Sequence, residues 1–390
     1  AQCSGAPMAT SILISARILG VALIALAGLP YSYWLLLGSK MALFSACMLG
    51  LFGLAACVRI RANPDTLNGK HIVVTGCDTG IGLALCQRLA RHGAVVYAGC
   101  LRVNSDGIAA LTKEYPDKVF PIQMDVTSDA QVAEAFRQVD DRLCEGADGG
   151  HFLWALVNNA GLQFSGDVEL TTLGQAQKIM DVNYFGLLRV TKAFLPLLRE
   201  RPGRLINVSS IRGRCAWPLA GPYTASKFAV EGLSDTLRLE LARFGIPVVL
   251  SEPSHYGGAT GMLSDEARIR AEFEQQWTNA EPHVQEAYGR EYLDAVCATV
   301  LSGAATSHPN LDPVLDDLLD ALASDAPKDR YLTAGTNSPW LDAYKWQAFA
   351  RDWAPATLHD AFNSWFSLSG LPLPASAAER LRQTRRGWFQ

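Results

Sequence analysis

A tyrosine and a lysine four residues apart are the side chains in this sequence best suited to proton transfer. Tyr223 and Lys227 stand in the run Tyr-Thr-Ala-Ser-Lys, and i, i+4 spacing places both on one face of a helix. A free phenol is a poor base at neutral pH, but a neighbouring ammonium favours the phenolate and lowers the phenol pKa. Tyr223 could then take a proton from an alcohol and return it in the reverse reaction.

Two polar residues upstream complete a candidate catalytic set. Ser210 follows a short apolar run and can donate a hydrogen bond to a substrate oxygen on which charge develops. Asn183, in the run Asp-Val-Asn-Tyr, could hold a water that links Lys227 to solvent. A Tyr-x-x-x-Lys pair alone is common by chance, for example on a surface helix. The order of these residues after a glycine loop makes chance a poor explanation.

The glycine loop, Thr75–Gly82, follows the first predicted strand and precedes a predicted helix. Gly76, Gly80 and Gly82 let the backbone turn tightly and approach a pyrophosphate, and the helix start supplies free N–H groups. A plain strand-to-helix turn is the alternative. The position at the first junction of an alternating fold favours a dinucleotide site.

Residues near the next two strands bear on the type of dinucleotide. Dinucleotide folds often carry an acid at the end of the second strand, and the segment 98–102 has none. Arg102 could instead bind the 2′-phosphate of NADP. The alternative is that Arg102 is a solvated loop residue. Asp125, after the third strand, could accept from the adenine amino group. Alternatively, Asp125 or Ser128 caps the following helix.

The elements that must position these residues alternate between short apolar runs and amphipathic stretches. We expect strands at 71–74, 94–99, 119–124, 152–157, 204–208 and 247–251, and helices at 81–92, 129–143, 173–198 and 222–244. Repeated β-α-β units imply an α/β fold of the Rossmann type, a doubly wound parallel sheet with helices on both faces. Ligands bind such sheets beyond the carboxyl ends of the strands, where the candidate residues stand.

The N-terminal part, residues 1–62, has a different composition. Two strongly apolar runs occupy 12–37 and 41–60, and about 20 apolar residues suffice to cross a bilayer. We therefore expect one or two membrane-anchoring segments before the catalytic domain. A cleaved signal peptide or a buried soluble helix is the alternative, but the apolar region is longer than one signal core.

Basic residues after the second run bear on topology. Arg59, Arg61 and Lys70 place the rest of the chain in the cytosol by the positive-inside rule, which Arg17 and Lys40 weaken. The expected location is the endoplasmic reticulum membrane with a cytosolic catalytic domain. A mitochondrial membrane is the alternative, although the N-terminus lacks an Arg-rich amphipathic pattern.

Charge and cysteine content exclude several other classes. The net charge of −4 over 390 residues argues against a nucleic-acid partner, which needs a concentrated basic face. The nine cysteines are scattered and form no Cys-x-x-Cys. Neither a disulfide framework nor a metal site is indicated.

Together these residues resemble the classical short-chain dehydrogenase/reductase family, over about 69–335. The likeness includes the motif Asn-Asn-Ala-Gly at 158–161, which in the family supports the sheet and the cofactor wall. It implies an enzyme acting on CH–OH donors with NAD(P), with Ser210 preferred to Ser209 because of its 13-residue spacing to the tyrosine. The implied catalytic residues are Asn183, Ser210, Tyr223 and Lys227. The implied cofactor site comprises Gly76, Asp78, Gly80, Ile81, Gly82, Arg102, Asp125, Val126, Asn159, Ala160, Gly161, Tyr223, Lys227, Pro253 and Thr260.

A narrower likeness is to the clade of 3-hydroxybutyrate, retinol and type 2 hydroxysteroid dehydrogenases. It rests on the segments 76–78, 98–101, 194–198 and 287–292. Members of this clade generally prefer NAD, so we expect NAD, with NADP not excluded. The usual Pro-Gly after the sixth strand is Pro253-Ser254 here, which predicts a shifted loop over the nicotinamide. Thr260 is still available to the carboxamide.

The catalytic domain is expected at 63–336, with a helical substrate lid at about 261–300 that includes Trp277 and Tyr288. Packing within the domain is the alternative role for each of these aromatic residues. An aromatic extension, 337–390, follows and forms either a membrane-interface segment or a packed helix pair.

The leading hypothesis is a membrane-associated NAD-dependent dehydrogenase for a secondary alcohol or ketone of a lipophilic, steroid- or retinoid-like substrate. A 3-hydroxybutyrate-type hydroxyacid dehydrogenase is the first alternative. A nucleotide-binding membrane scaffold without turnover is the second, and the complete catalytic set argues against it. A homodimer is left open.

Overall fold

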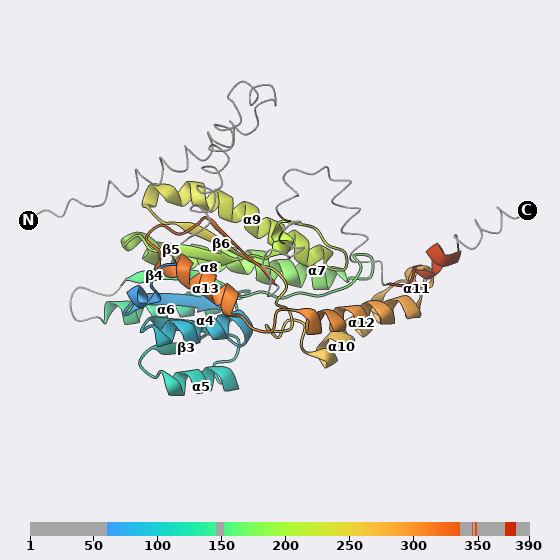
Figure 1. Cartoon of the computed structure of the whole chain (residues 1–390), viewed down its shortest axis with the longest axis horizontal. Helices are drawn as coiled ribbons and strands as arrows, with labels where there is room; N and C mark the ends of the chain where they lie inside the picture. The colour runs from blue at the N-terminus through green and yellow to red at the C-terminus, as the bar shows by residue number, and fades with distance from the viewer. Residues whose placement is uncertain (1–60, 146–151, 336–344, 346–347, 349–370, 380–390) are drawn as a thin grey trace, which may run out of the picture. The chain divides into compact units, whose positions relative to one another are not determined.

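Seven parallel strands form the central sheet of the protein (Figure 1). The computed structural model describes residues 61–145, 152–335, 345, 348 and 371–379. Contacts divide the chain into the units Ala1–Arg61 and Ala62–Gln390, and the sheet belongs to the second. Its order is β3-β2-β1-β4-β5-β6-β7, which confirms the predicted Rossmann-type sheet. The strands are β1 (His71–Thr75), β2 (Val95–Cys100), β3 (Val119–Gln123), β4 (Leu153–Asn158), β5 (Arg204–Val208), β6 (Val248–Pro253) and β7 (Arg330–Thr333).

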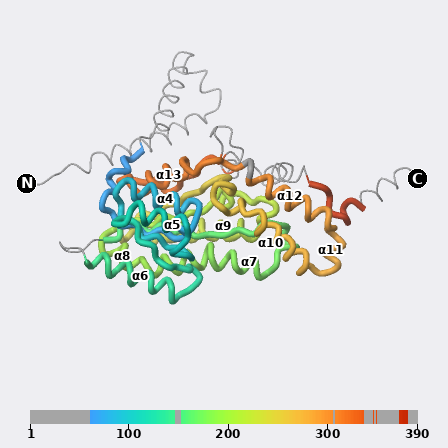
Figure 2. The backbone as a smooth tube through the Cα atoms, turned by 90° about the horizontal axis from the view of Figure 1, so that it is seen from below, coloured from blue at the N-terminus to red at the C-terminus, as the bar shows by residue number. Residues whose placement is uncertain are grey.

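Helices cover both faces of this sheet (Figure 2). On one face, α4 (Gly80–Arg91), α5 (Asp106–Glu114) and α13 (Asp312–Ala323) form one buried apolar cluster with the sheet. On the other face, α6 (Asp129–Cys144), α8 (Leu187–Glu200) and α9 (Gly221–Leu241) form a second cluster. Because both faces are covered, the central strands β1 and β5 are buried at every position.

The long helix expected at 173–198 is interrupted. It comprises α7 (Leu173–Met180), a π-helical segment η2 (Asp181–Gly186) and α8. Short π-helical insertions often mark functional sites. Asn183 lies inside this segment and is buried, so the widened turn decides where the predicted catalytic asparagine points.

The segment predicted to form a lid contains three helices, α10 (Glu266–Asn279), α11 (Pro282–Tyr288) and α12 (Arg290–Thr306). In both views they lie together at one end of the domain. They share an apolar cluster that contains Ile269, Phe273 and Leu293. Leu371, from the predicted C-terminal extension, packs against the same cluster. Short 3-10 helices complete the described elements at η1 (Pro64–Leu67), η3 (Ile211–Gly213) and η4 (Ala242–Phe244).

None of the helices in the described part of the chain is long and apolar enough to cross a membrane. The runs at 12–37 and 41–60, predicted as membrane segments, lie outside the described residues, as does most of the aromatic extension.

Candidate active site

A cavity of about 550 Å³ lies where the chain leaves the carboxyl ends of the strands. The loops after β1, β3, β4, β5 and β6 all contribute to its wall, as the parallel topology requires. The predicted site residues that line it are Gly76, Asp78, Gly80, Ile81, Arg102, Asp125, Val126, Asn159, Ala160, Gly161, Ser210, Tyr223, Lys227, Pro253 and Thr260. Gly82, Asn183, Trp277 and Tyr288 are not among the residues that line it.

The glycine loop is packed too closely for larger residues. Gly76 and Gly80 have φ values of 71° and 61°, in the left-handed region. A Cβ on Gly76 would lie 2.7 Å from the Cα of Ala160, and one on Gly82 would lie 2.2 Å from the carbonyl oxygen of Gly76. The N-cap residue of α4, Thr79, makes no side-chain capping hydrogen bond. The loop therefore brings backbone and the helix start to the cavity, an arrangement that fits a pyrophosphate.

A carboxylate lies beside the end of β2, although the segment 98–102 carries none. Asp78, from the glycine loop, accepts hydrogen bonds from the backbone N–H groups of Leu101 and Arg102, both at 2.9 Å. Parallel pairing of β1 with β2 brings the two strand ends together. Arg102 is exposed and lines the same part of the cavity.

The structure decides which of Asp125 and Ser128 caps the helix after β3, while contact of Asp125 with adenine stays a prediction. Ser128 is the N-cap of α6, and its hydroxyl accepts from the N–H of Gln131. Asp125 lines the cavity, and its Oδ1 accepts from the N–H and hydroxyl of Thr127. The helix cap is therefore provided by Ser128.

The Asn-Asn-Ala-Gly segment ties the glycine loop to β4. Asn159 donates from Nδ2 to the carbonyl oxygens of Thr75 and Gly76, at 2.9 and 3.1 Å. Thr75 Oγ1 accepts from the N–H groups of Asn159 and Ala160, both at 3.0 Å. Asn158 is buried and donates to Thr191 and Asn207 on neighbouring elements. These bonds fix one wall of the cavity to the sheet.

Ser210, Tyr223 and Lys227 line the same cavity, and all three are buried. Ser210 caps η3 directly after β5, and its Oγ accepts from the N–H of Arg212 at 3.2 Å. Lys227 donates from Nζ to the carbonyl oxygen of Val208 at 2.9 Å. The same Nζ lies 5.7 Å from the ring centre of Tyr223, so the predicted helix face brings the ammonium and the phenol together.

Both polar atoms of the Asn183 side-chain amide form hydrogen bonds within the protein. Its Oδ1 accepts from the N–H of Leu162 at 2.8 Å, and its Nδ2 donates to the carbonyl oxygen of Leu162 and to Ser226 Oγ. A Cβ on Gly161 would lie 3.3 Å from Asn183 Oδ1 and 3.7 Å from Lys227 Nζ. The side chain therefore positions the loop after β4 and α9. A water link from Asn183 to Lys227 stays a prediction.

Burial dominates the proton affinities of the pair. Burial raises the pKa of Tyr223 above its ordinary value, while the hydrogen bond with Ser210 and the charge of Arg212 lower it. Burial lowers the pKa of Lys227 to about 8, and the carboxylate of Glu231 acts in the opposite direction. We had expected Lys227 to make the phenol more acidic. In the structure, loss of solvent outweighs the favourable charges around Tyr223, so its pKa rises.

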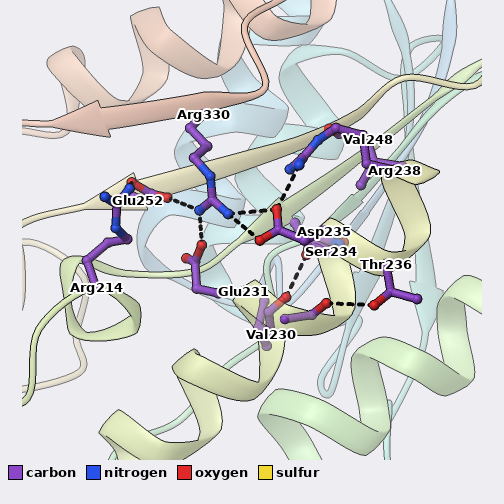
Figure 3. A network of polar contacts seen from close by, with 12 residues as sticks. Arg214, Val230, Glu231, Ser234, Asp235, Thr236, Arg238, Val248, Glu252 and Arg330 are labelled. Carbon is purple, nitrogen blue, oxygen red and sulfur yellow. Dashed lines mark hydrogen bonds and ion pairs between the residues drawn. The ribbon is translucent and has the colours of Figure 1, made fainter. Parts of the chain in front are cut away.

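An ion network joins α9 to β6 and β7 (Figure 3). Arg330, on β7, donates to Glu231 on α9, to Glu252 on β6 and to Asp235. Arg214 lies 3.7 Å from Glu252. Glu252 is fully buried, and burial followed by the charge of Glu231 raises its pKa to about 7 against the opposing effect of Arg330. The network holds α9, which carries Tyr223 and Lys227, against the edge of the sheet.

The loop after β6, which lacks the usual glycine, is bound to β7; the predicted shift of this loop over the nicotinamide stays a prediction. The N–H of Ser254 donates to the carbonyl oxygen of Thr333 at 3.0 Å, which ties the loop to β7. Thr260 lines the cavity and donates from Oγ1 to the carbonyl oxygen of Gly257 at 3.2 Å. Contact of Thr260 with the nicotinamide carboxamide stays a prediction.

Trp277 and Tyr288, the aromatic residues predicted for the lid, do not line the cavity. Trp277 packs against the apolar cluster of α10–α12, and Tyr288 donates from its hydroxyl to Glu169 at 3.0 Å. Within the segment 261–300, the cavity is lined by Met262 and Leu263, which precede α10. Contact of Trp277 and Tyr288 with substrate stays a prediction.

Several lining residues were not predicted. Beside the recognised motifs, the cavity is lined by Leu162, Gln163, Ile211, Arg212, His255, Met262 and Leu263. Most of them directly follow residues that we had identified at strand ends. Their adjacency to those motifs was the available signal, because the loops after parallel strands converge at one edge of the sheet.

Comparison with known proteins gives a consistent picture. The family model described as short chain dehydrogenase matches residues 70–268. D-beta-hydroxybutyrate dehydrogenase, mitochondrial, from Bos taurus is 36% identical over 272 residues, 69% of this chain and 78% of the relative. 17-beta-hydroxysteroid dehydrogenase type 6 from Homo sapiens is 34% identical, covering 74% and 88%. Retinol dehydrogenase 16 from Mus musculus is 32% identical, covering 84% and 98%.

Solved structures agree on the fold. A short chain dehydrogenase from Burkholderia cenocepacia in complex with NADP has a TM-score of 0.51 at 26% identity, covering 76% of this chain and 98% of that one. A short chain dehydrogenase/reductase from Burkholderia phymatum in complex with NAD has a TM-score of 0.58 at 21% identity, covering 74% and 95%. Together with the cavity and its buried Ser210, Tyr223 and Lys227, these matches identify the family of the protein. The chain belongs to the short-chain dehydrogenase/reductase family and is an oxidoreductase that acts on CH–OH donors with a nicotinamide cofactor.

Proposed function

We propose that the protein is an NAD-dependent dehydrogenase that interconverts a secondary alcohol and the corresponding ketone of a lipophilic molecule. One observation carries the proposal. Ser210, Tyr223 and Lys227 are buried in the lining of a cavity that also contains the glycine loop. The donor, the proton-transfer group and the cofactor cradle therefore lie within a single site.

The chemistry follows from the residues of this site. When bound, the cofactor supplies the acceptor for the hydrogen and electron pair that leave the substrate carbon. Ser210 donates a hydrogen bond to the substrate oxygen and stabilises the charge that develops there. Tyr223 takes the hydroxyl proton in oxidation and returns it in reduction. Lys227 donates to the carbonyl oxygen of Val208, which holds its ammonium close to the Tyr223 ring.

Asp78 supports NAD over NADP. Its carboxylate is held at the end of β2 by two backbone N–H groups. A carboxylate can accept from ribose hydroxyls but repels a 2′-phosphate. The positive charge of Arg102 would favour a 2′-phosphate, and therefore NADP. Arg102 is exposed, however, so solvent and salt screen its charge.

Apolar side chains around the catalytic residues support a lipophilic substrate. Leu162, Ile211, Met262 and Leu263 line the cavity. The human and mouse relatives are named for hydroxysteroid and retinol substrates. The bovine relative is named for hydroxybutyrate, which keeps a hydroxyacid as the second candidate.

A screen on the purified full chain in detergent tests the proposal. Formation of NADH or NADPH is followed with steroid secondary alcohols, a retinoid alcohol and 3-hydroxyacids, each with NAD and with NADP. We expect turnover of at least one lipophilic alcohol and a higher kcat/KM with NAD. Binding of NADH without turnover of any alcohol in the panel would favour the scaffold hypothesis instead.

Attachment to a membrane through residues 1–62 is a further part of the proposal. Its support is the apolar sequence of that part. The endoplasmic reticulum is the favoured location, with a mitochondrial membrane as the alternative. A homodimer stays a proposal that light scattering in detergent would test.

A further inference from the structure

Leu219 has a backbone conformation that leucine rarely adopts. Its φ is 65°, and in the described part of the chain it is the one residue other than glycine with a positive φ. The Cβ of an ordinary residue makes this left-handed region unfavourable, so a bulky residue stays there only where its surroundings hold it. Leu219 stands four residues before Tyr223. Its surroundings therefore bear on the segment that carries the proposed proton-transfer group.

The side chain of Leu219 is held by the helices α10–α12. It is half-buried and packs against their apolar cluster, which contains Ile269, Phe273 and Leu293. Leu219 is not among the residues that line the cavity. An effect of Leu219 on the site must therefore pass through its backbone.

The backbone of Leu219 is held by the loop after β4. Its carbonyl oxygen accepts from the N–H of Gly166 at 2.9 Å, and Gly166 pairs with Ala220 in an isolated parallel bridge. This loop is bound to α10 in turn, because the fully buried Gln276 donates from Nε2 to the carbonyl oxygen of Ser165 at 2.9 Å. A Cβ on Gly166 would lie 2.5 Å from Gln276 Oε1. Both supports of Leu219 thus lead to the helices α10–α12.

On its other side, Leu219 leads directly into the first turn of α9. The N-cap residue of this helix is Ala220, whose carbonyl oxygen accepts from the N–H of Thr224 at 2.8 Å. Tyr223 lies within the same turn. A change of φ at Leu219 would therefore redirect the start of the helix and displace the phenol.

We infer that Leu219 is a positioning residue for Tyr223. Its side chain, packed in the cluster of α10–α12, holds a strained backbone conformation, and this conformation sets the direction in which α9 begins. The inference rests on the proposed function, in which Tyr223 exchanges the proton of the substrate. Packing within α10–α12 thereby affects proton transfer, although Leu219 lies outside the lining of the cavity.

Three substitutions of Leu219 separate packing from backbone strain. Leu219→Ala removes the packing but keeps the strain, so the turn should relax and kcat should fall by about 10²-fold, as a misplacement of about 1 Å can cost. Leu219→Gly removes both, and because glycine adopts positive φ freely, about tenfold of this loss should be recovered. Leu219→Met keeps the apolar volume and should retain most of the wild-type kcat. Loss of packing alone predicts the opposite order of Gly and Ala, since glycine is smaller and more flexible.

The full chain in detergent is assayed with NAD and testosterone, retinol or 3-hydroxybutyrate, and the variants are compared on the alcohol that wild type oxidises fastest. Turnover is expressed per NADH-binding site, measured by fluorescence, so that a loss of folded protein does not count as a loss of activity. The solvent deuterium isotope effect on kcat should be larger in Leu219→Ala, because a misplaced Tyr223 slows proton transfer. A purely structural role of Leu219 would leave both values unchanged.

Leu301 provides the matched control. It lies on α12, is half-buried and packs against the same cluster, but its backbone is helical. Leu301→Ala and Leu301→Gly therefore remove the same side chain without releasing strain. Glycine is less favourable than alanine in a helix, so Leu301→Gly should be no more active than Leu301→Ala.

The failure of this inference differs from failure of the proposed function. Equal kcat in wild type and Leu219→Ala, or a Leu219→Gly variant no more active than Leu219→Ala, would overturn the role of Leu219 while the dehydrogenase stands. If wild type forms NADH from none of the alcohols, the proposed function fails and the role of Leu219 fails with it.

Discussion

The proton affinity of Tyr223 depends on opposing effects from a few neighbours. Burial raises the pKa of the phenol, while Ser210 and Arg212 lower it. Burial also destabilises the charged form of Lys227 and thereby lowers its pKa to about 8. Both groups thus titrate away from their ordinary values, as is common where proton transfer occurs.

Replacement of Ser210 tests the hydrogen bond to the substrate oxygen. Ser210→Ala should lower kcat/KM by about 10²–10³-fold, because a preorganised donor is lost. NADH affinity should change little, since the glycine loop is untouched. A larger loss of kcat/KM in Ser209→Ala than in Ser210→Ala would show that Ser209, and not Ser210, donates this hydrogen bond.

Replacement of Lys227 separates stability from activity. Its folded pKa of about 8 lies below the unfolded value of 10.5. Between these two pH values the unfolded chain therefore binds more protons than the folded chain. Burial of the charged Lys227 lowers the free energy of unfolding by its full amount below pH 8, and this penalty decreases as the pH rises above 8. Lys227→Met should abolish turnover yet raise the free energy of unfolding at pH 7 by on the order of 1–2 kcal/mol.

Urea denaturation at pH 7 and pH 10 measures this effect. The gain from Lys227→Met should shrink at pH 10, where less of the lysine is protonated in either state. A variant that is less stable than wild type at pH 7 would show that burial of the ammonium is not costly here.

Among the elements, β7 supplies the cation that joins α9 to β6. Arg330 contacts Glu231, Glu252 and Asp235. Removing a partner from a buried ion network leaves uncompensated charge and costs about 3–5 kcal/mol. Arg330→Leu should therefore destabilise the domain far more than Arg88→Leu, which removes a surface pair with Asp312.

The effect of Arg330→Leu should depend on pH. Glu252 has a folded pKa of about 7, raised above its ordinary 4.5. The folded state therefore favours the protonated carboxyl, and the resulting contribution to the free energy of unfolding is complete below pH 4.5 and is lost as the pH rises through 7. Without Arg330 the charged carboxylate is disfavoured further. Denaturation should show a larger loss at pH 8 than at pH 5.5, and an equal loss at both would contradict the coupling.

The sequence predicted β1–β6 because their apolar runs are long enough to stand out, and it missed β7. That strand has four residues, alternates between buried and half-buried positions, and is defined by its pairing with β6 about 80 residues earlier. Helix α5 was missed for a similar reason, since Ile108 and Leu111 are its buried residues. The break at η2 was also missed, because a π turn has no distinct periodicity.

The site was predicted where topology alone decides it, at the ends of parallel strands. Asp78 and Arg212 show the limit of that reasoning. Asp78 was expected at the cofactor, but its contact with the end of β2 depends on strand pairing. Arg212 lines the cavity because η3 turns it there, and a short turn leaves no readable pattern in sequence.

For the whole molecule, the unit Ala62–Gln390 contains the sheet and the residues proposed to be catalytic. Leu371, from the predicted C-terminal extension, packs against the cluster of α10–α12. The boundary at 337 stays a prediction.

Membrane attachment is tested on the full chain. After alkaline carbonate extraction of membranes from expressing cells, the protein should stay in the pellet, because apolar spans are not released with peripheral proteins. A luminal marker protein, released by the same treatment, is the control. Recovery of the chain in the supernatant would reject spans in residues 1–62.

The most direct test of the account is turnover by wild type and Tyr223→Phe with NAD and the same secondary alcohol. Loss of the phenolic proton-transfer group should lower kcat by at least about 10²–10⁴-fold while NADH still binds. Wild type should produce one ketone for each NADH formed. Equal turnover by Tyr223→Phe, or NADH formation without a ketone, would contradict catalysis by Tyr223 in this cavity.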